Sequence, residues 1–337
     1  MHQILMAEKE IDIEDIFEQF EDLRVVVVGD VMLDKYFWGT VDRISPEAPV
    51  PVVRVNQKES RLGGAANVAL NCKQLGATVT IASVIGNDAD GIVLTEMMKN
   101  AGIGTELLLN SEHRPTTTKS RIISRNQQMI RLDEEVTEEL NIKEEHHFID
   151  MTLRFLQIEK PHLVIFEDYN KGVLKENIIE KIIAHCKNIG ITTAVDPKFS
   201  NFLSYKDVDI FKPNLKEVKE GLGINLDSLN EKCLYEVHQR LSEEINHKVT
   251  LLTLSEHGMY YHDDTQGALI PTMVRSVSDV SGAGDTVIAV AAMVYELTRD
   301  VSVMARWSNL AGGLVCEEAG VVPISREVFL KELQQQF

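Results

Sequence analysis

The sequence has few cysteines, and none of the spacing that would join them to one another or to a metal. The four, Cys72, Cys186, Cys233 and Cys316, lie far apart among apolar or helical residues. No C-x-x-C pair and no histidine spacing typical of zinc sites accompanies them. A disulfide framework and a zinc module are therefore excluded. We predict four buried free thiols in a cytoplasmic protein.

Long apolar runs and an excess of positive charge are also missing. No stretch approaches the roughly 20 apolar residues that cross a membrane, and the N-terminus lacks the basic start and cleavage site of a signal peptide. The sequence has 34 basic and 52 acidic residues, which gives a formal net charge of −18. Because duplex nucleic-acid binders usually carry a basic face, we expect neither nucleic acid nor membrane as a partner.

What the sequence does contain is an alternation of buried strands and helices. The run RVVVVGD at 24–30 is typical of a strand that is buried on both faces. Similar runs occupy 78–86, 162–169, 191–197, 208–214 and 248–258. Helical patterns occupy 65–76, 88–101, 137–159, 174–189, 215–222, 227–245, 285–300 and 301–320. This order predicts an α/β fold in three layers, with a mostly parallel central sheet between two layers of helices.

Two segments interrupt that alternation and indicate a small lid. Residues 34–62 and 116–133 lack a helical period and contain polar–apolar alternation. We predict antiparallel strands outside the main sheet, in a lid formed by about 34–62 and 113–133. The rest of 24–337 forms one domain, and 1–23 forms an acidic amphipathic leader helix. Apolar residues on both sides of a small sheet need cover, so the lid is expected to form a homodimer.

The stretch SGAGD at 281–285 has the parts of an anion site. Gly282 and Gly284 tolerate backbone angles closed to other residues, and the helix that follows directs its positive end to the same place. Asp285 could take a proton from a hydroxyl that attacks a phosphoryl group. Ordinary helix capping by an acid in the first turn is the alternative. The stretch is neither a G-x-x-x-x-G-K-[ST] loop nor a dinucleotide fingerprint.

A second glycine pair precedes another predicted helix. Gly63 and Gly64 would let the main chain approach a ligand, and Asn67 can donate to and accept from sugar hydroxyls. Asp30 ends the first strand, where ligands gather in open α/β sheets. A helix start with a packing glycine, and an aspartate that forms a turn, are the alternatives.

These motifs resemble those of the ribokinase-like (PfkB) sugar kinases. GDVMLD, LGGAANVA, PNLKEV and DVSGAGDT occur here in the order and spacing of that family, over about residues 24–325. The resemblance implies a ribokinase-like fold, ATP and Mg²⁺ as cofactors, and phosphoryl transfer to a sugar hydroxyl. It leaves dependence on a monovalent cation open.

The resemblance also implies roles for particular residues. Asp285 would be the catalytic base, in an anion hole formed by Gly282, Ala283 and Gly284. The ATP contacts would be Asn214, Leu215, Lys216, Glu217, Thr253, Ser255 and Gly258. Asn214 and Glu217 would act on Mg²⁺ through water. Capping of the next helix by the same two side chains is compatible with that role.

A closer resemblance is to the kinase half of the bacterial heptose-phosphate kinases. It rests on GDVMLDKYFWGTVDRISPEAPVPVV and SRNQQMIRLD. It implies phosphorylation of D-glycero-β-D-manno-heptose 7-phosphate at O1, towards ADP-heptose and lipopolysaccharide. The sequence has no H-x-G-H nucleotide motif, so a kinase without the fused adenylyltransferase is expected. The sugar hydroxyls would be held by Asp30, Asp34, Gly63, Gly64 and Asn67.

A phosphorylated substrate needs fixed cations. Arg121, Arg125 and Arg131 would share one face if 121–131 were a single strand. Lys171 is a further candidate, as are Lys119, Arg43 and Arg61. Solvated charges on an edge strand are the alternative. Two other functions remain open: a kinase of another sugar (fructose, fructose phosphate or ketodeoxygluconate), and a non-catalytic sensor on the same fold.

Overall fold

The computed structural model describes residues 12–125, 127–226, 228–272 and 275–336. Within them, the main sheet has nine strands in the order β13-β12-β11-β10-β9-β8-β1-β4-β5. The strands are β1 (Arg24–Gly29), β4 (Thr78–Gly86), β5 (Gly104–Ser111), β8 (Leu163–Glu167), β9 (Thr192–Asp196), β10 (Ile210–Phe211), β11 (Val249–Thr253), β12 (Met259–His262) and β13 (Gly267–Ile270). Only the pairings of β12 are antiparallel. The predicted, mostly parallel sheet is therefore confirmed.

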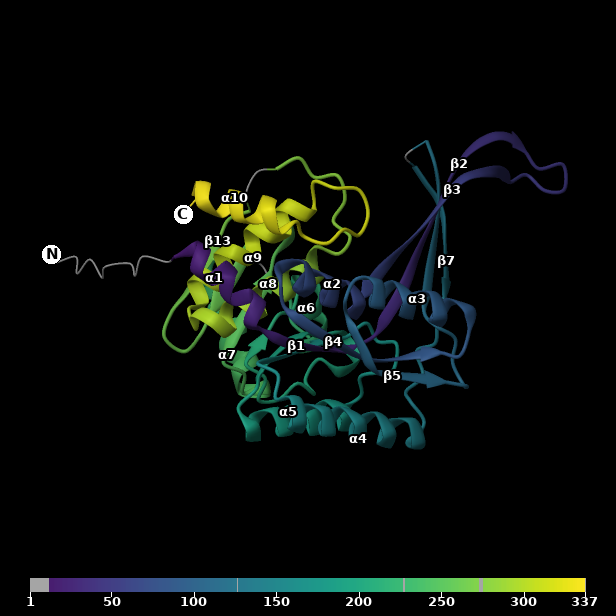
Figure 1. The fold of residues 1–337 in the computed structure, drawn as a ribbon. Helices are drawn as coiled ribbons and strands as arrows, with labels where there is room; N and C mark the ends of the chain where they lie inside the picture. The colour runs from purple at the N-terminus through teal and green to yellow at the C-terminus, as the bar shows by residue number, and fades with distance from the viewer. Residues whose placement is uncertain (1–11, 126, 227, 273–274, 337) are drawn as a thin grey trace.

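Helices cover both faces of this sheet, as the continuous β-branched strands predict (Figure 1). Val25 and Val27 of β1 face a core shared with α1 (Ile13–Gln19), α2 (Ala65–Leu75), α3 (Ala89–Asn100), α8 (Ala283–Thr298), α9 (Val301–Val315) and α10 (Arg326–Gln336). Val26 and Val28 face a core shared with α4 (Ile142–Glu159), α5 (Glu176–Ile189), α6 (Leu215–Leu222) and α7 (Glu231–Ile245). Alternate side chains of one strand thus enter opposite cores.

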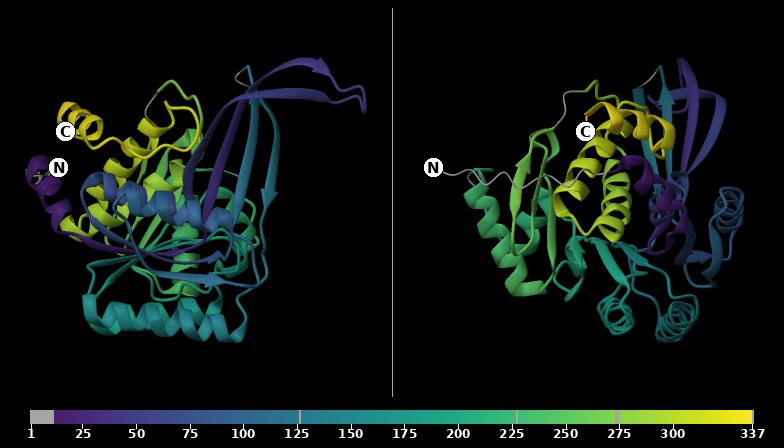
Figure 2. Two further views of the ribbon diagram at one scale, coloured as in Figure 1. Left: turned by 45° about the vertical axis from the view of Figure 1, so that its right-hand side comes forward. Right: turned by 60° about the vertical axis from the view of Figure 1, so that its left-hand side comes forward.

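The lid is a separate four-stranded sheet in the order β3-β2-β6-β7. It contains β2 (Val31–Ile44), β3 (Pro51–Gly64), β6 (Thr118–Ser124) and β7 (Gln127–Glu134). The β2–β3 hairpin projects beyond the body of the molecule (Figures 1 and 2). The prediction of an antiparallel lid was wrong in one respect, because β2 and β6 pair in parallel. These two strands come from distant parts of the chain, so no hairpin turn dictates their direction.

The second lid segment is a hairpin and not one strand. β6 pairs antiparallel with β7, which places Arg121 directly opposite Arg131. Arg125 lies after the end of β6 with a left-handed φ of 51°. The prediction that three arginines share one face of one strand is therefore wrong. Arg121 and Arg131 share a face as cross-strand neighbours, whereas Arg125 is an exposed residue of the turn.

Most predicted elements form within a few residues of their expected bounds, and the exceptions have local causes. The helix expected from residue 137 begins at Ile142, because Asn141 caps it with a capping box. The strand expected at 208–214 has two residues, because Pro213 has no amide for a ladder and Asn214 caps α6. The strand expected at 248–258 ends at Thr253. β5, β13 and α10 were not predicted from the sequence pattern.

The N-terminal segment packs on the main body. α1 and a short 3₁₀ turn at Phe20–Asp22 lie within the predicted leader, whose residues 1–11 are outside the described part of the chain. Phe17 contacts the rings of Trp307 and Phe329. The division into leader and kinase domain stays a prediction.

Two predictions made from the composition of the whole sequence concern the state of the cysteines and membrane-spanning segments. Cys72 and Cys186 are buried, as predicted, but Cys233 and Cys316 are partly exposed; all four are free. Among the described helices, none is long and apolar enough to cross a membrane.

Candidate active site

The candidate site lies at the carboxyl edge of the main sheet. β1, β8 and β9 end side by side, and Glu167 of β8 has Gly29 and Asp196 as its lateral neighbours. The first turns of α2 and α8 also reach this edge, because Asn67 of α2 contacts Asp285 of α8. In open α/β sheets this edge is where ligands bind.

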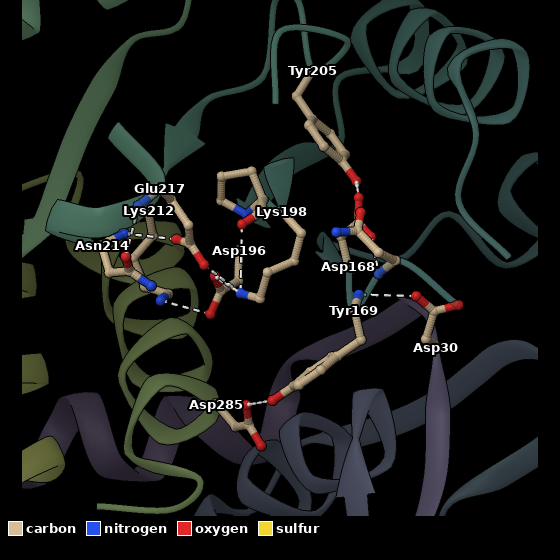
Figure 3. Close-up of polar contacts among 12 residues, drawn as sticks. Asp30, Asp168, Tyr169, Asp196, Lys198, Tyr205, Lys212, Asn214, Glu217 and Asp285 are labelled. Atoms are coloured by element: carbon tan, nitrogen blue, oxygen red, sulfur yellow. Dashed lines mark hydrogen bonds and ion pairs between the residues drawn. The ribbon is translucent and has the colours of Figure 1, made fainter. Parts of the chain in front are cut away.

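Asp285 is buried and accepts a hydrogen bond at each carboxylate oxygen; Figure 3 draws the one from Tyr169. Asn67 Nδ2 donates to its Oδ2 over 2.8 Å, and the Tyr169 hydroxyl donates to its Oδ1 over 2.8 Å. Burial raises the pKa of Asp285 to about 6, while these two hydrogen bonds hold it down. A carboxylate with that pKa is ionised at neutral pH and still able to take up a proton, which suits a general base.

Of the two glycines before Asp285, Gly282 alone has the backbone angle that was predicted. It has a φ of 81° at the N-cap of α8, and a Cβ there would lie 3.0 Å from Asn67 Nδ2. Gly284 has no positive φ, and a Cβ there would lie 3.5 Å from Asp196 Oδ2, an ordinary contact distance. The α8 N-terminus thus borders both side chains. Its positive end favours negative charge at this position.

A largely buried ionic network lies beside the α8 N-terminus (Figure 3). Asp196 Oδ2 pairs with Lys212 over 2.7 Å, and Asp196 Oδ1 with Lys198 over 3.1 Å. Lys198 pairs in turn with Glu217 over 2.7 Å. Asp196, Lys198 and Lys212 were not among the predicted site residues. The signal available for Asp196 was its place at the end of a buried strand, which is also where Asp30 lies.

The predicted ATP residues form a second group beside this network. Asn214 and Glu217 make a reciprocal capping box at the start of α6, with contacts of 2.9 and 2.8 Å. Asn214 also forms a bridge with Thr253. Gly258 ends the turn that begins at Ser255, with a φ of 94°. Capping, the alternative weighed for Asn214 and Glu217, is present and leaves a role toward ATP open.

Leu215 and Lys216 occupy the first two positions of α6. The Lys216 side chain is 81% exposed and lies 3.7 Å from Glu220. Leu215 is partly exposed at the start of α6. The structure therefore places Lys216 on the surface, and its predicted role in binding ATP stays a prediction.

The predicted sugar residues form a third group under the lid. A Cβ at Gly63 would lie 2.4 Å from Asp34 Oδ2, and one at Gly64 would lie 2.4 Å from the carbonyl oxygen of Asp30. Asp34 pairs with Arg121 over 2.6 Å. The two glycines let β3 pass directly over both aspartates.

Asp30 has a structural task in addition to any contact with sugar. Its carboxylate accepts hydrogen bonds from the amides of Tyr169, Lys171 and Val173, over 2.9 to 3.1 Å. Burial and the charge of Asp168 raise its pKa to about 6. Asp30 therefore holds the loop that carries Tyr169 toward Asp285. Tyr169 was not among the predicted site residues, because its role depends on this loop.

Replacing Tyr169 by phenylalanine is expected to shift the acid limb of the pH–rate profile. The variant removes a donor to Asp285 Oδ1, and loss of that donor raises the pKa of the carboxyl further. We expect the acid limb of kcat/KM to move up by about one to two pH units, so activity falls more at pH 6 than at pH 8. The matched control is Tyr235→Phe, which removes from an exposed side chain a hydroxyl that accepts from Gln239. An unmoved limb in Tyr169→Phe would refute this role.

Sequence and fold comparisons identify the family of this chain. The sequence profile of the pfkB family carbohydrate kinases matches residues 22–327. The chain belongs to the pfkB family. Its relatives include the D-beta-D-heptose 7-phosphate kinase of Bordetella bronchiseptica, which is 40% identical over 90% of this chain and 94% of that protein.

Other relatives of this pfkB-family chain are longer. The bifunctional protein HldE of Sulfurimonas denitrificans is 36% identical over 90% of this chain. The one from Desulfatibacillum aliphaticivorans is 38% identical over 94% of this chain. The chain spans 62% and 64% of the length of these two relatives.

Solved structures share the fold at low sequence identity. Phosphofructokinase-2 from Escherichia coli, solved with potassium, superposes with a TM-score of 0.75 and 17% identity, covering 92% of this chain and 97% of that one. Ribokinase from Arabidopsis thaliana, solved with ribose and ATP, gives 0.71 and 18%, covering 92% and 99%. The predicted ribokinase-like fold is confirmed.

Proposed function

We propose that this kinase transfers the γ-phosphoryl group of ATP to O1 of D-glycero-β-D-manno-heptose 7-phosphate, in the cytoplasm, on the route to ADP-heptose and lipopolysaccharide. The main support is the relative named for heptose 7-phosphate, which matches this chain over nearly the whole length of both proteins. The cations on the inner face of the lid are a second support, because a neutral sugar needs none of them.

The proposed reaction uses Asp285 as the base. The sugar lies between the lid and the sheet edge, with its O1 hydroxyl at Asp285. As O1 attacks phosphorus, its proton passes to Asp285 and the bond to the ADP oxygen breaks. Asn67 and Tyr169 hold the carboxylate in place through the hydrogen bonds described above. The α8 N-terminus, at Gly282, Ala283 and Gly284, lies beside the developing charge.

The residues near ATP suit Mg²⁺ that arrives with the nucleotide. Among the described residues, no cluster of three or more His, Cys, Asp or Glu side chains could hold a metal ion. Glu217 and Asn214 provide one carboxylate and one amide, and Mg²⁺ usually binds through one or two carboxylates, waters and phosphates. When bound, the ion neutralises phosphate charge. A monovalent cation belongs to the same proposal, and one related structure holds potassium.

We also propose that two chains associate through their lids. Ile130 and Leu132 of β7 are 50% and 53% exposed, and cross-strand pairing places Ile130 opposite Ile122. Such apolar side chains on an exposed sheet favour association. Sedimentation at several concentrations tests this, and a monomer mass at all of them would refute it.

A substrate panel tests the function. ADP release with Mg·ATP would be measured on D-glycero-D-manno-heptose 7-phosphate, fructose 6-phosphate, fructose, ribose and ketodeoxygluconate. We expect strong preference for the heptose phosphate. Turnover on an unphosphorylated sugar alone would keep the kinase and refute the substrate, whereas no sugar-dependent ADP release would favour a non-catalytic sensor.

A further inference from the structure

Cationic side chains lie on the face of the lid that carries Asp34 and on the loop that carries Tyr169. Four of them already have a carboxylate partner. Arg61 pairs with Glu59 over 2.6 Å, Arg121 with Asp34 over 2.6 Å, Arg131 with Asp133 over 2.9 Å, and Lys171 with Glu135 over 2.7 Å. Because they are paired, these four offer less to an incoming anion than an unpaired cation would.

Lys119 differs from these four. It lies between Asp34 of β2 and Asp133 of β7 in the lid sheet, but each of those carboxylates is held by an arginine. No hydrogen bond or ion pair joins the Lys119 ammonium to any residue in the described part of the chain. The side chain is half-buried, and desolvation lowers its pKa; the charge of Asp34 opposes this shift, and the charge of Lys171 adds to it. A desolvated ammonium gains more from an anion than a solvated one.

Lys119 and Asp285 contact the same tyrosine. The Lys119 ammonium lies 5.5 Å from the centre of the Tyr169 ring, and the hydroxyl of the same side chain donates to Asp285. Lys119 and the proposed base therefore border the same part of the site, one over the tyrosine ring and the other at its hydroxyl.

Lys198 also lies over the Tyr169 ring, at 5.4 Å, but it belongs to the other side of the site. It is paired with Asp196 and Glu217, beside the predicted ATP residues. Of the two ammonium groups at this ring, Lys119 is the one on the lid.

We propose that Lys119 binds the phosphate group that the sugar substrate already carries, and so selects phosphorylated sugars. This inference rests on the proposed function. From the sequence alone, several arginines and lysines were candidates for binding the substrate phosphate, and the inference selects one of them. Arg121, Arg131 and Lys171 keep their carboxylate partners.

The test compares the binding of a phosphorylated and an unphosphorylated sugar. Calorimetry without ATP would give Kd for D-glycero-D-manno-heptose 7-phosphate and for the same heptose without phosphate. The variants are Lys119→Met and a matched control, Lys58→Met. Lys58 is also a lid lysine over an aromatic ring, 5.8 Å from the centre of Phe37. It pairs with Phe37 in the sheet, so it lies on the opposite face of the lid from Asp34 and Tyr36.

We expect Lys119→Met to weaken binding of the heptose phosphate by about tenfold to a hundredfold, as for loss of one charge-assisted hydrogen bond. Binding of the neutral heptose should stay unchanged, and Lys58→Met should behave as the unmodified protein. An unchanged preference for the phosphate in Lys119→Met would overturn the role of Lys119 alone. No preference in the unmodified protein would overturn the proposed substrate, and Lys119 with it.

Discussion

Replacing Asp285 by asparagine is expected to lower turnover by about 10²- to 10⁴-fold, the usual contribution of a positioned general base. Asparagine has nearly the same shape and keeps an oxygen for one of the two donors, Asn67 or Tyr169. It cannot take up the O1 proton. The fold and the affinity for sugar should therefore survive, and the loss should appear in kcat. ADP release with the best sugar of the panel measures it.

The control for this variant addresses capping, the alternative reading of an acid at a helix start. Asp300→Asn is suitable, because Asp300 caps α9 by accepting from the amides of Ser302 and Val303. It should leave turnover unchanged, since asparagine also caps well. If Asp285→Asn kept near-normal turnover, Asp285 would not be the base, and the base would have to be sought elsewhere.

Replacing Lys212 by methionine is expected to destabilise the protein by about 3 kcal/mol, at the lower end of the range for breaking a buried ion pair. Lys212 is 2% exposed and pairs with Asp196 over 2.7 Å. The variant leaves Asp196 buried with Lys198 as its remaining cation. The free energy of unfolding in urea measures the effect.

Two further variants show whether the cause is the uncompensated charge. Lys216→Met, four residues along, removes a lysine that is 81% exposed and should change stability by less than about 0.5 kcal/mol. Adding Asp196→Asn to Lys212→Met removes the carboxylate charge left without Lys212, and should restore part of the lost free energy of unfolding. A single variant as stable as the unmodified protein would refute this account of the network.

Features that depend on a few consecutive residues could be predicted from the sequence alone. A β-branched run without alternation predicts a strand buried on both faces, and β1 enters both cores through alternate valines. Glycine pairs before helices predict close approach of the main chain, and Gly63 and Gly282 make such approaches. Periodicity and turn chemistry act over a few residues, so a single sequence reveals them. Asp285 was singled out by such a motif together with the family resemblance, and its role as the base stays a prediction.

The partners of those residues were decided only by the tertiary structure. Asn67 reaches Asp285 across 218 positions of sequence, and Tyr169 reaches it across 116. The lid arginines illustrate the same limit. Their spacing predicted one strand with one charged face, but a turn at Arg125 folds the segment into a hairpin. Arg121 and Arg131 then form ion pairs with Asp34 and Asp133, respectively. Ion pairing and burial depend on which strands become neighbours. That choice is made by long-range packing of the whole sheet, and no local pattern records it.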